Sequence, residues 1–231
     1  MIKAVFFDLD NTLTDTEGNS HDAMRQMFED LHLNRRFDSF ELFWQTYRQC
    51  NDEIWRRYRL KEISREELNN LRFAWPMELL GVKDDLLEQK INEVFFSHFL
   101  KLRKTMPHAY EVLDYLKNKY RLAVVSNGTK SSQHQKMANF GFQPYFETMV
   151  LSDDVGFPKP DKRIFEKTLE IMQVSAAEAI MIGDDFDADI VGAQRAGIRQ
   201  IWFNPFHVEL TDGKDAPDYT IADLNELVNI L

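Results

Sequence analysis

The stretch Phe6-Phe7-Asp8-Leu9-Asp10-Asn11-Thr12-Leu13-Thr14 decides the fold of this chain. The largely apolar run of residues 2–7 predicts a short strand that is buried on both faces. It ends in two carboxylates, Asp8 and Asp10, and an Asn-Thr turn follows. Buried carboxylates cost free energy unless a cation meets them, and ligands commonly bind at the carboxyl ends of parallel strands. Taken alone, the stretch indicates either a cation-binding strand end or a strand that leaves the core into a solvated acidic turn.

Only helical patterns follow this strand, from about residue 19 to residue 104. Apolar side chains recur there at helical spacing. The stripes cover residues 23–31, 43–58 and 87–102. Residues 64–67, Ser-Arg-Glu-Glu, have the sequence of a capping box, and Pro76 is expected to break or kink the helix that begins there. Together these patterns predict a small helical bundle inserted after the first strand.

From Pro107 onward, predicted strands alternate with predicted helices. The strands are expected at residues 122–125, 148–151, 179–182, 200–203 and 219–221, and the helices at 109–116, 131–140, 161–169, 187–196 and 224–231. Such alternation implies right-handed crossovers and a parallel sheet with helices on both faces. The sequence therefore predicts an α/β fold. Residues 1–14 and 105–231 form a doubly wound, Rossmann-like parallel sheet domain, and residues 15–104 form an all-helical cap that lies as a lid over the strands' carboxyl ends.

Composition narrows the class of protein. With 231 residues, 44% of them hydrophobic, the chain can build a large core. A net charge of −10 and the lack of a long basic run exclude a nucleic acid polymer as the expected partner. The single cysteine, Cys50, lies on a helical apolar stripe and is expected to fill the core of a protein in a reducing compartment. There is no signal-peptide pattern and no apolar run of ~18 residues. We expect a cytoplasmic protein without membrane contact, a monomer or a weak homo-oligomer.

A second acidic run follows a later strand, at Gly183-Asp184-Asp185-Phe186-Asp187-Ala188-Asp189. Its four carboxylates repel one another. A helix N-terminus tolerates part of that repulsion, which by itself could account for Asp185 and Asp187. Asp184 follows the strand directly, as Asp8 and Asp10 do, and three acids at one edge of a sheet need a cation. Because no His or Cys accompanies these hard oxygen ligands, Mg²⁺ is the expected ion.

Two further segments fall at the same level of the predicted sheet. Lys159 lies between Pro158 and Pro160, which restrict its backbone, so we expect a fixed cation beside the acids. Ser126-Asn127-Gly128 offers a hydroxyl and backbone N–H groups that suit a phosphate, although an ordinary strand-to-helix turn is the alternative. In a doubly wound sheet these two segments and the two acidic ones would converge on a single crevice.

In this order and spacing, the four segments resemble the four motifs of the haloacid dehalogenase superfamily. The helical insert resembles the alpha-helical cap class of that superfamily, and the resemblance covers essentially the whole chain. Most members are Mg²⁺-dependent phosphatases that work through an aspartyl-phosphate. The true dehalogenases lack an acid at the position of Asp10, so the resemblance disfavours dehalogenation.

The resemblance implies a role for each matching residue. Asp8 would be the nucleophile, and Asp10 would protonate the leaving oxygen and then activate water. The Asp8 and Asp184 carboxylates and the Asp10 backbone carbonyl would bind Mg²⁺. Lys159 would offset the charge of the phosphate. Ser126, with Asn127 and Gly128, would bind the phosphoryl oxygens. Asp189 would lie outside the metal ligands and orient either those ligands or Lys159, and Asp185 is expected beside it.

The predicted cap is similar to that of the pyrimidine nucleoside 5′-monophosphatases of the superfamily. The similarity lies in residues 47–55, in Ile63-Ser64 and in Arg72-Phe73. An aromatic side chain such as Trp55 or Phe73 could stack on a base, and Asn51 or Arg72 could hydrogen-bond to it. The alternative is that these aromatic residues simply pack the helical bundle.

The expected substrate is therefore a small phosphorylated metabolite, with a pyrimidine nucleotide as the first candidate. A phosphatase or phosphomutase that acts on phosphoglycolate or a sugar phosphate is the alternative within the same class. A non-catalytic binding protein is a third possibility. The full set of acids and the lysine argue against it, because an abandoned site has no reason to keep so many mutually repelling carboxylates.

Overall fold

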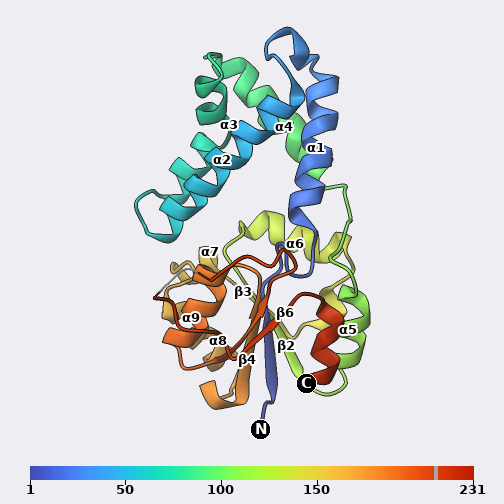
Figure 1. Cartoon of the computed structure of the whole chain (residues 1–231), viewed down its shortest axis with the longest axis vertical. Helices are drawn as coiled ribbons and strands as arrows, with labels where there is room; N and C mark the ends of the chain where they lie inside the picture. Colours follow the sequence, from blue (N-terminus) through green and yellow to red (C-terminus); the bar gives the residue numbers. More distant parts are fainter. Residues whose placement is uncertain (211–212) are drawn as a thin grey trace. The chain divides into compact units, whose positions relative to one another are not determined.

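The computed structural model describes residues 1–210 and 213–231, and the chain divides into two compact units (Figure 1). The core unit consists of residues 1–16 and 103–231, and the cap unit of residues 17–102. The boundaries thus fall at 16/17 and 102/103, where the sequence predicts 14/15 and 104/105. The N-terminal strand and the C-terminal half of the chain therefore fold together around an inserted helical segment.

The core unit contains a six-stranded sheet in the order β3-β2-β1-β4-β5-β6. The strands are β1 (Ala4–Phe7), β2 (Arg121–Ser126), β3 (Thr148–Leu151), β4 (Ala179–Gly183), β5 (Arg199–Phe203) and β6 (Tyr219–Ile221). All neighbouring pairs are parallel, and Phe7 is in register with Val124 of β2 and Ile182 of β4. This arrangement confirms the predicted doubly wound sheet and places the end of β1 between the ends of β2 and β4.

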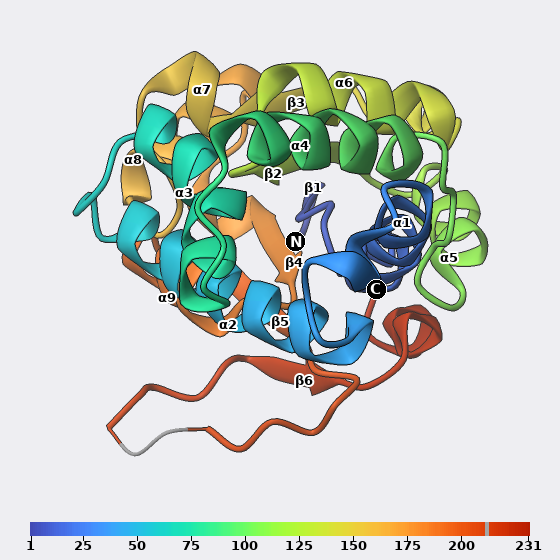
Figure 2. The same ribbon diagram turned by 90° about the horizontal axis from the view of Figure 1, so that it is seen from above.

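The two faces of β1 pack against different helical layers. Val5 and Phe7 belong to a cluster that includes α5 (Ala109–Leu116) and the 3₁₀-helix η5 (Leu224–Asn229). Ala4 and Phe6 pack instead with α8 (Lys162–Met172) and α9 (Val191–Arg195). Figure 2 shows α8 and α9 on one side of the sheet and α5 on the other. Coverage on both sides explains why the strand is apolar throughout.

The connections of the core unit differ from the prediction in several places. The predicted helix 187–196 begins as a π-helical turn, η4 (Phe186–Ile190), before α9, and such turns are frequent at functional sites. The predicted terminal helix is the 3₁₀-helix η5, and a short helix α7 (Ser152–Val155) was not predicted. The other connecting elements are α6 (Lys130–Asn139), η2 (Gln143–Tyr145) and η3 (Ala176–Glu178).

The cap unit is helical, as predicted. Its elements are α1 (Thr16–Asp30), η1 (Leu33–Arg35), α2 (Phe40–Arg59), α3 (Arg65–Leu79) and α4 (Asp85–Phe99). The capping box of α3 is present: Glu67 N–H donates to Ser64 Oγ, and Ser64 N–H donates to Glu67 Oε2 at 2.7 Å. Pro76 does not end this helix, which continues to Leu79. Cys50 is buried among apolar side chains, as expected.

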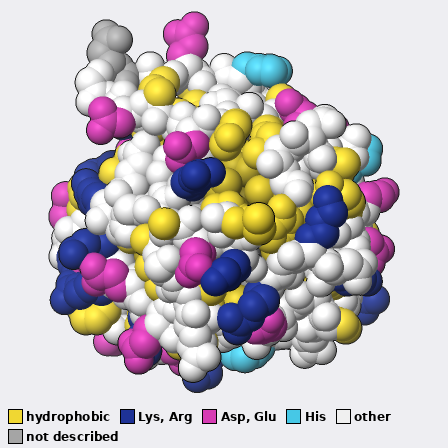
Figure 3. Space-filling view, turned by 90° about the horizontal axis from the view of Figure 1, so that it is seen from below, with side chains coloured by type: hydrophobic (Ala, Val, Ile, Leu, Met, Phe, Trp, Pro, Cys, Tyr) yellow, Lys and Arg dark blue, Asp and Glu magenta, His cyan; other side chains and the backbone are white. Residues whose placement is uncertain are grey.

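Figure 3 shows the face of the core unit at the amino ends of the strands, where hydrophobic side chains gather amid acidic and basic ones. Within residues 1–210 and 213–231, no helix is both long enough and apolar enough to span a membrane.

Candidate active site

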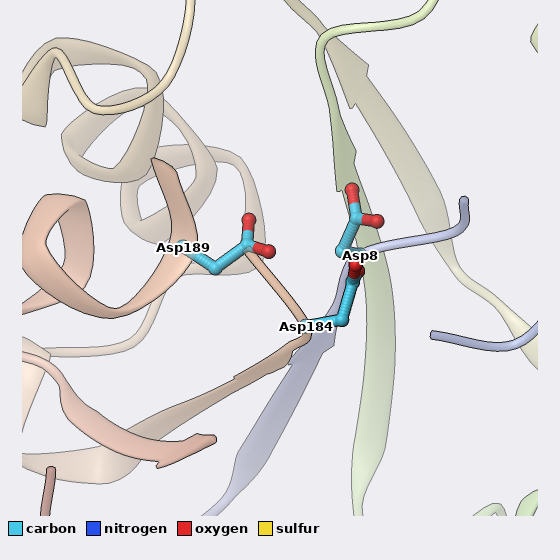
Figure 4. Close-up of side chains that lie close together, drawn as sticks. All are labelled: Asp8, Asp184 and Asp189. Atoms are coloured by element: carbon cyan, nitrogen blue, oxygen red, sulfur yellow. The ribbon is translucent and has the colours of Figure 1, made fainter. Parts of the chain in front are cut away.

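Three carboxylates meet at the carboxyl ends of β1 and β4. Asp8 directly follows β1 and Asp184 directly follows β4, and the Asp8 N–H donates to Ile182 O at 2.9 Å. Asp189 comes from the π-helical turn η4. One oxygen of each carboxylate lies within 4.8 Å of the others, and Figure 4 shows the three side chains together. The topology of the sheet therefore creates a compact acidic site from distant parts of the sequence.

Lys159 supplies the positive charge of this cluster. Its Nζ lies 2.5 Å from Asp8 Oδ1 and 2.6 Å from Asp189 Oδ1, and it also donates to Val125 O at 2.8 Å. The side chain is almost completely buried. One ammonium group thus faces two carboxylates, and within the described chain Asp184 has no ion pair with a lysine or arginine.

The pKa values of the cluster reflect this excess of negative charge. Burial raises the pKa of Asp8 despite Lys159, and burial together with Asp8 and Asp189 raises the pKa of Asp184 well above its usual value. Burial, reinforced by Asp8 and Asp185, raises the pKa of Asp189 to about 8. Burial alone would lower the pKa of Lys159, but Asp189 and Asp8 outweigh it and raise that pKa. Hard oxygen ligands that lack sufficient positive charge fit a divalent ion such as Mg²⁺.

Two residues that the sequence did not single out hold Asp184 in place. Thr12 Oγ1 donates to Asp184 Oδ1 at 2.9 Å and accepts from the Asp184 N–H at 3.0 Å. The indole N–H of Trp202 donates to Asp184 O at 2.9 Å. Thr12 lies in the stretch of residues 6–14 that carries Asp8 and Asp10, so its hydroxyl could have been predicted as part of the site. The contact of Trp202 depends on the pairing of β4 with β5, which the local sequence does not indicate.

Asp10 has a separate set of partners. It accepts hydrogen bonds from Thr16 Oγ1 at 2.6 Å and Gln133 Nε2 at 2.6 Å, and it forms an ion pair with Lys136. Burial alone would raise the pKa of Asp10. The charge of Lys136 and these hydrogen bonds outweigh that effect and lower it. Sequence reasoning missed Gln133 and Lys136, although both lie on the helix that follows the Ser126-Asn127-Gly128 segment.

The Ser126-Asn127-Gly128 segment begins with the last residue of β2, Ser126. Ser126 is buried, and its Oγ accepts from the Gly128 N–H at 3.0 Å. The side-chain amide of Asn127 contacts the Lys159 backbone at both ends, with Nδ2 donating to Lys159 O at 3.0 Å and Oδ1 accepting from Lys159 N–H at 2.8 Å. The Asn127 side chain therefore holds the lysine segment, and its predicted contact with a phosphate would be made by the backbone.

The remaining predicted residues occupy two different places. Asp185 begins the π-helical turn, where its Oδ1 accepts from Ala188 N–H at 2.9 Å and its own N–H donates to Asp189 Oδ2 at 3.2 Å. Asn51, Trp55 and Arg72 lie in the cap unit. The Trp55 ring packs edge-on against Tyr58, and the Arg72 guanidinium lies 5.3 Å from the centre of the Phe96 ring.

A buried lysine among carboxylates with raised pKa values, at the strand ends of a doubly wound sheet, is typical of an enzyme. The comparisons agree. The family model of the haloacid dehalogenase-like hydrolases matches residues 2–197, and the chain belongs to that family. The predicted resemblance is thereby confirmed.

The similar proteins include several phosphatases. The chain is 30% identical to the pyrimidine 5′-nucleotidase PynA of Streptococcus pneumoniae, covering 99% of this chain and 94% of the relative. It is 29% identical to the pyrimidine 5′-nucleotidase YjjG of Escherichia coli, covering 98% and 96%. It is 33% identical to the glyceraldehyde 3-phosphate phosphatase of Methanothermobacter thermautotrophicus, covering 100% of both chains.

A solved structure is similar over the whole chain. It is that of the HAD-hydrolase YfnB from Bacillus subtilis bound to magnesium, with a TM-score of 0.85 and 31% identity. The alignment covers 100% of this chain and 98% of that one. The magnesium belongs to that protein. In this chain, Asp8, Asp184 and Asp189 are a group of carboxylates that could hold a metal ion.

Proposed function

We propose that this hydrolase is a Mg²⁺-dependent phosphomonoesterase that forms an aspartyl-phosphate on Asp8. The observation that carries the proposal is the buried contact of Lys159 Nζ with Asp8 at 2.5 Å inside a cluster of three carboxylates. Such a contact orients the carboxylate for attack and places a positive charge where a phosphate would approach. Carboxylates of this kind serve as nucleophiles in phosphoryl transfer.

The residues that would hold Mg²⁺ are the carboxylates of Asp8 and Asp184 and the backbone carbonyl of Asp10. The ion would supply positive charge that offsets the repulsion between a carboxylate and a phosphate ester. Thr12 would keep Asp184 oriented, since it contacts both the side chain and the N–H of that residue.

The reaction would proceed in two displacements. First, an Asp8 oxygen attacks phosphorus, the bond from phosphorus to the ester oxygen breaks, and that oxygen takes the electron pair and a proton from Asp10. Next, water attacks the phosphorus and gives a proton to the Asp10 carboxylate. The bond from phosphorus to Asp8 then breaks, with its electron pair returning to Asp8. The lowered pKa of Asp10 favours the carboxylate form that the second step requires, and it makes the protonated form that the first step requires less abundant.

For the substrate, we infer a pyrimidine nucleoside 5′-monophosphate. The support comes from two relatives named as pyrimidine 5′-nucleotidases. In the cap, Asn51, Trp55 and Arg72 remain the predicted base-binding residues. A sugar or triose phosphate is the second candidate, because a 33% identical relative is a glyceraldehyde 3-phosphate phosphatase.

A substrate panel tests the proposal. The full chain is incubated with pyrimidine and purine mononucleotides, sugar phosphates and phosphoglycolate, with Mg²⁺ or with a chelator, and released phosphate is measured. Release from pyrimidine nucleotides only when Mg²⁺ is present is the expected result. Release mainly from sugar phosphates would redirect the substrate assignment. No release from any ester would contradict the phosphatase proposal, and phosphate transfer to a second substrate without free phosphate would indicate a mutase.

A further inference from the structure

Two buried side chains of α6 point at one carboxylate of the site. Gln133 and Lys136 are three residues apart and therefore lie on the same face of the helix. Gln133 Nε2 donates to Asp10 Oδ2 at 2.6 Å, and Lys136 Nζ forms an ion pair with Asp10 Oδ1. Only 9% of the Lys136 side chain is exposed, against 28% of the Asp10 side chain. In an ordinary surface ion pair both side chains are exposed to solvent. Here the lysine is almost buried, and the carboxylate that it contacts is the more exposed partner.

The chain also makes room for this arrangement. Gly128 lies beside Gln133, and a Cβ atom built at Gly128 would lie 1.6 Å from Gln133 Nε2. Any other residue at position 128 would therefore displace the Gln133 amide from its path to Asp10. The glycine at position 128 therefore leaves space for the side chain that reaches Asp10, while its N–H donates to Ser126 Oγ.

The three donors are distributed unequally over the carboxylate. Oδ1 receives both Thr16 and Lys136, whereas Oδ2 receives Gln133 alone among the described residues. A carboxylate has about four lone-pair positions, so one position on Oδ2 remains for exchange with a reacting oxygen. Contacts to both oxygens also prevent rotation of the group about its Cβ–Cγ bond.

We propose that Gln133 and Lys136 are positioning residues that fix the orientation in which Asp10 exchanges its proton. This inference rests on the proposed phosphatase function. The first displacement needs Asp10 to protonate the leaving oxygen, and the second needs the same group to take a proton from water. When the leaving group does not need a proton, the first displacement no longer depends on Asp10, but the second still does. Loss of the orientation should then slow the second displacement more than the first.

The test uses the full chain with Mg²⁺ and p-nitrophenyl phosphate, whose leaving group departs as a stable anion. We expect Lys136→Met to release about one equivalent of p-nitrophenol per protein in a fast burst. Steady turnover should then be ~10–100-fold slower than in the wild type, because water attack still needs Asp10. Phosphorylated protein should accumulate and be visible by intact mass. With a mononucleotide, whose leaving oxygen needs a proton, the first turnover should slow as well.

Lys130→Met is the matched control, since Lys130 lies on the same helix but pairs with Asp154 at the surface; it should behave as the wild type. Equal losses of burst and steady turnover in folded Lys136→Met would overturn the positioning role, as would unchanged turnover. If circular dichroism shows that Lys136→Met does not fold, Gln133→Met carries the same test from the other oxygen. The phosphatase proposal fails separately, when the wild-type chain cleaves no ester.

Discussion

The negative charge around Asp8 is only partly balanced by Lys159. Lys159 contacts it directly, yet burial still raises its pKa, and Lys159 is shared with Asp189. A structural ion pair would place one lysine against one acid. The surplus of carboxylates around a single lysine is instead typical of a functional site, as the proposed Mg²⁺-dependent phosphatase would have.

Replacing Asp8 with Asn should abolish turnover while the fold stays intact. The amide has the same shape but cannot attack phosphorus, so a loss of at least ~10³-fold is expected. Lys159 keeps Asp189 as its partner, so no unpaired charge is left buried. Phosphate release and thermal unfolding measure the two effects. Asp187→Asn, at an exposed acid paired with Lys214, is the control that should stay active. Activity in Asp8→Asn would show that the nucleophile is another residue.

Gly128 and Gln133 should be strongly coupled. Gly128→Ala places a methyl group 1.6 Å from Gln133 Nε2, the far end of a flexible side chain, so the amide should move aside. The protein should then lose about 0.5–1.5 kcal/mol, the net contribution of the hydrogen bond from Gln133 to Asp10. In a Gln133→Ala background the same methyl group has space, and Gly128→Ala should cost far less. Urea unfolding of the wild type, both single variants and the double variant gives the coupling free energy. Additive effects would mean that the close approach at Gly128 does not limit the fold.

At the scale of elements, the segment that carries Lys159 is held by the end of β2. The Asn127 amide donates to the Lys159 carbonyl and accepts from the Lys159 N–H, as a paired strand residue would. This contact explains why a lysine outside any helix or strand is held closely enough to face Asp8. The prolines at positions 158 and 160, on which the sequence argument relied, are thus only part of the restraint.

Asn127→Ala should therefore weaken both stability and catalysis. It leaves the Lys159 N–H and carbonyl without their Asn127 partners, which costs ~1–3 kcal/mol where such groups are buried. Because Lys159 is then less well placed, turnover should fall as well. Chemical unfolding and phosphate release measure the two losses. Asn118→Ala is the control, since Asn118 makes one exposed contact to Asp114 O and its loss should change neither quantity. Wild-type turnover in Asn127→Ala would show that the prolines alone place the lysine.

At the scale of the whole molecule, the acidic cluster links stability to pH and to Mg²⁺. The pKa of Asp189 is raised to about 8, so the folded state binds this proton more tightly than the unfolded state does. Stability from this group is fully present below its unfolded pKa of about 4 and is lost as the pH rises through about 8. A divalent ion at the cluster would replace the lost proton.

Mg²⁺ should therefore raise the melting temperature more at about pH 8.5 than at about pH 5.5, where protons compete for the carboxylates. Thermal unfolding at both pH values, with Mg²⁺ or with a chelator, measures the difference. Asp184→Asn should reduce the Mg²⁺ effect at both pH values, because it removes a predicted ligand. A stabilisation by Mg²⁺ that is equal at both pH values and in this variant would place the ion elsewhere.

Much of the fold was predictable because its signals are local. Strand and helix periodicity, the acids that follow β1 and β4, and the capping box of α3 are all properties of a few neighbouring residues. The π-helical turn at residues 186–190 was not predictable in this way, since its sequence is compatible with an ordinary helix. The same applies to Pro76, which helix α3 accommodates although proline disfavours helix interiors.

The sequence by itself determined the α/β class, the inserted helical segment and the residues that end the strands, because each depends on short-range pattern and turn chemistry. Only the tertiary structure decided which of those residues meet. Thr12 and Asp184 are 172 residues apart, and Asp10 and Lys136 are 126 apart. Their contacts arise because β1 lies between β2 and β4, and the choice of strand neighbours depends on the packing of the whole sheet.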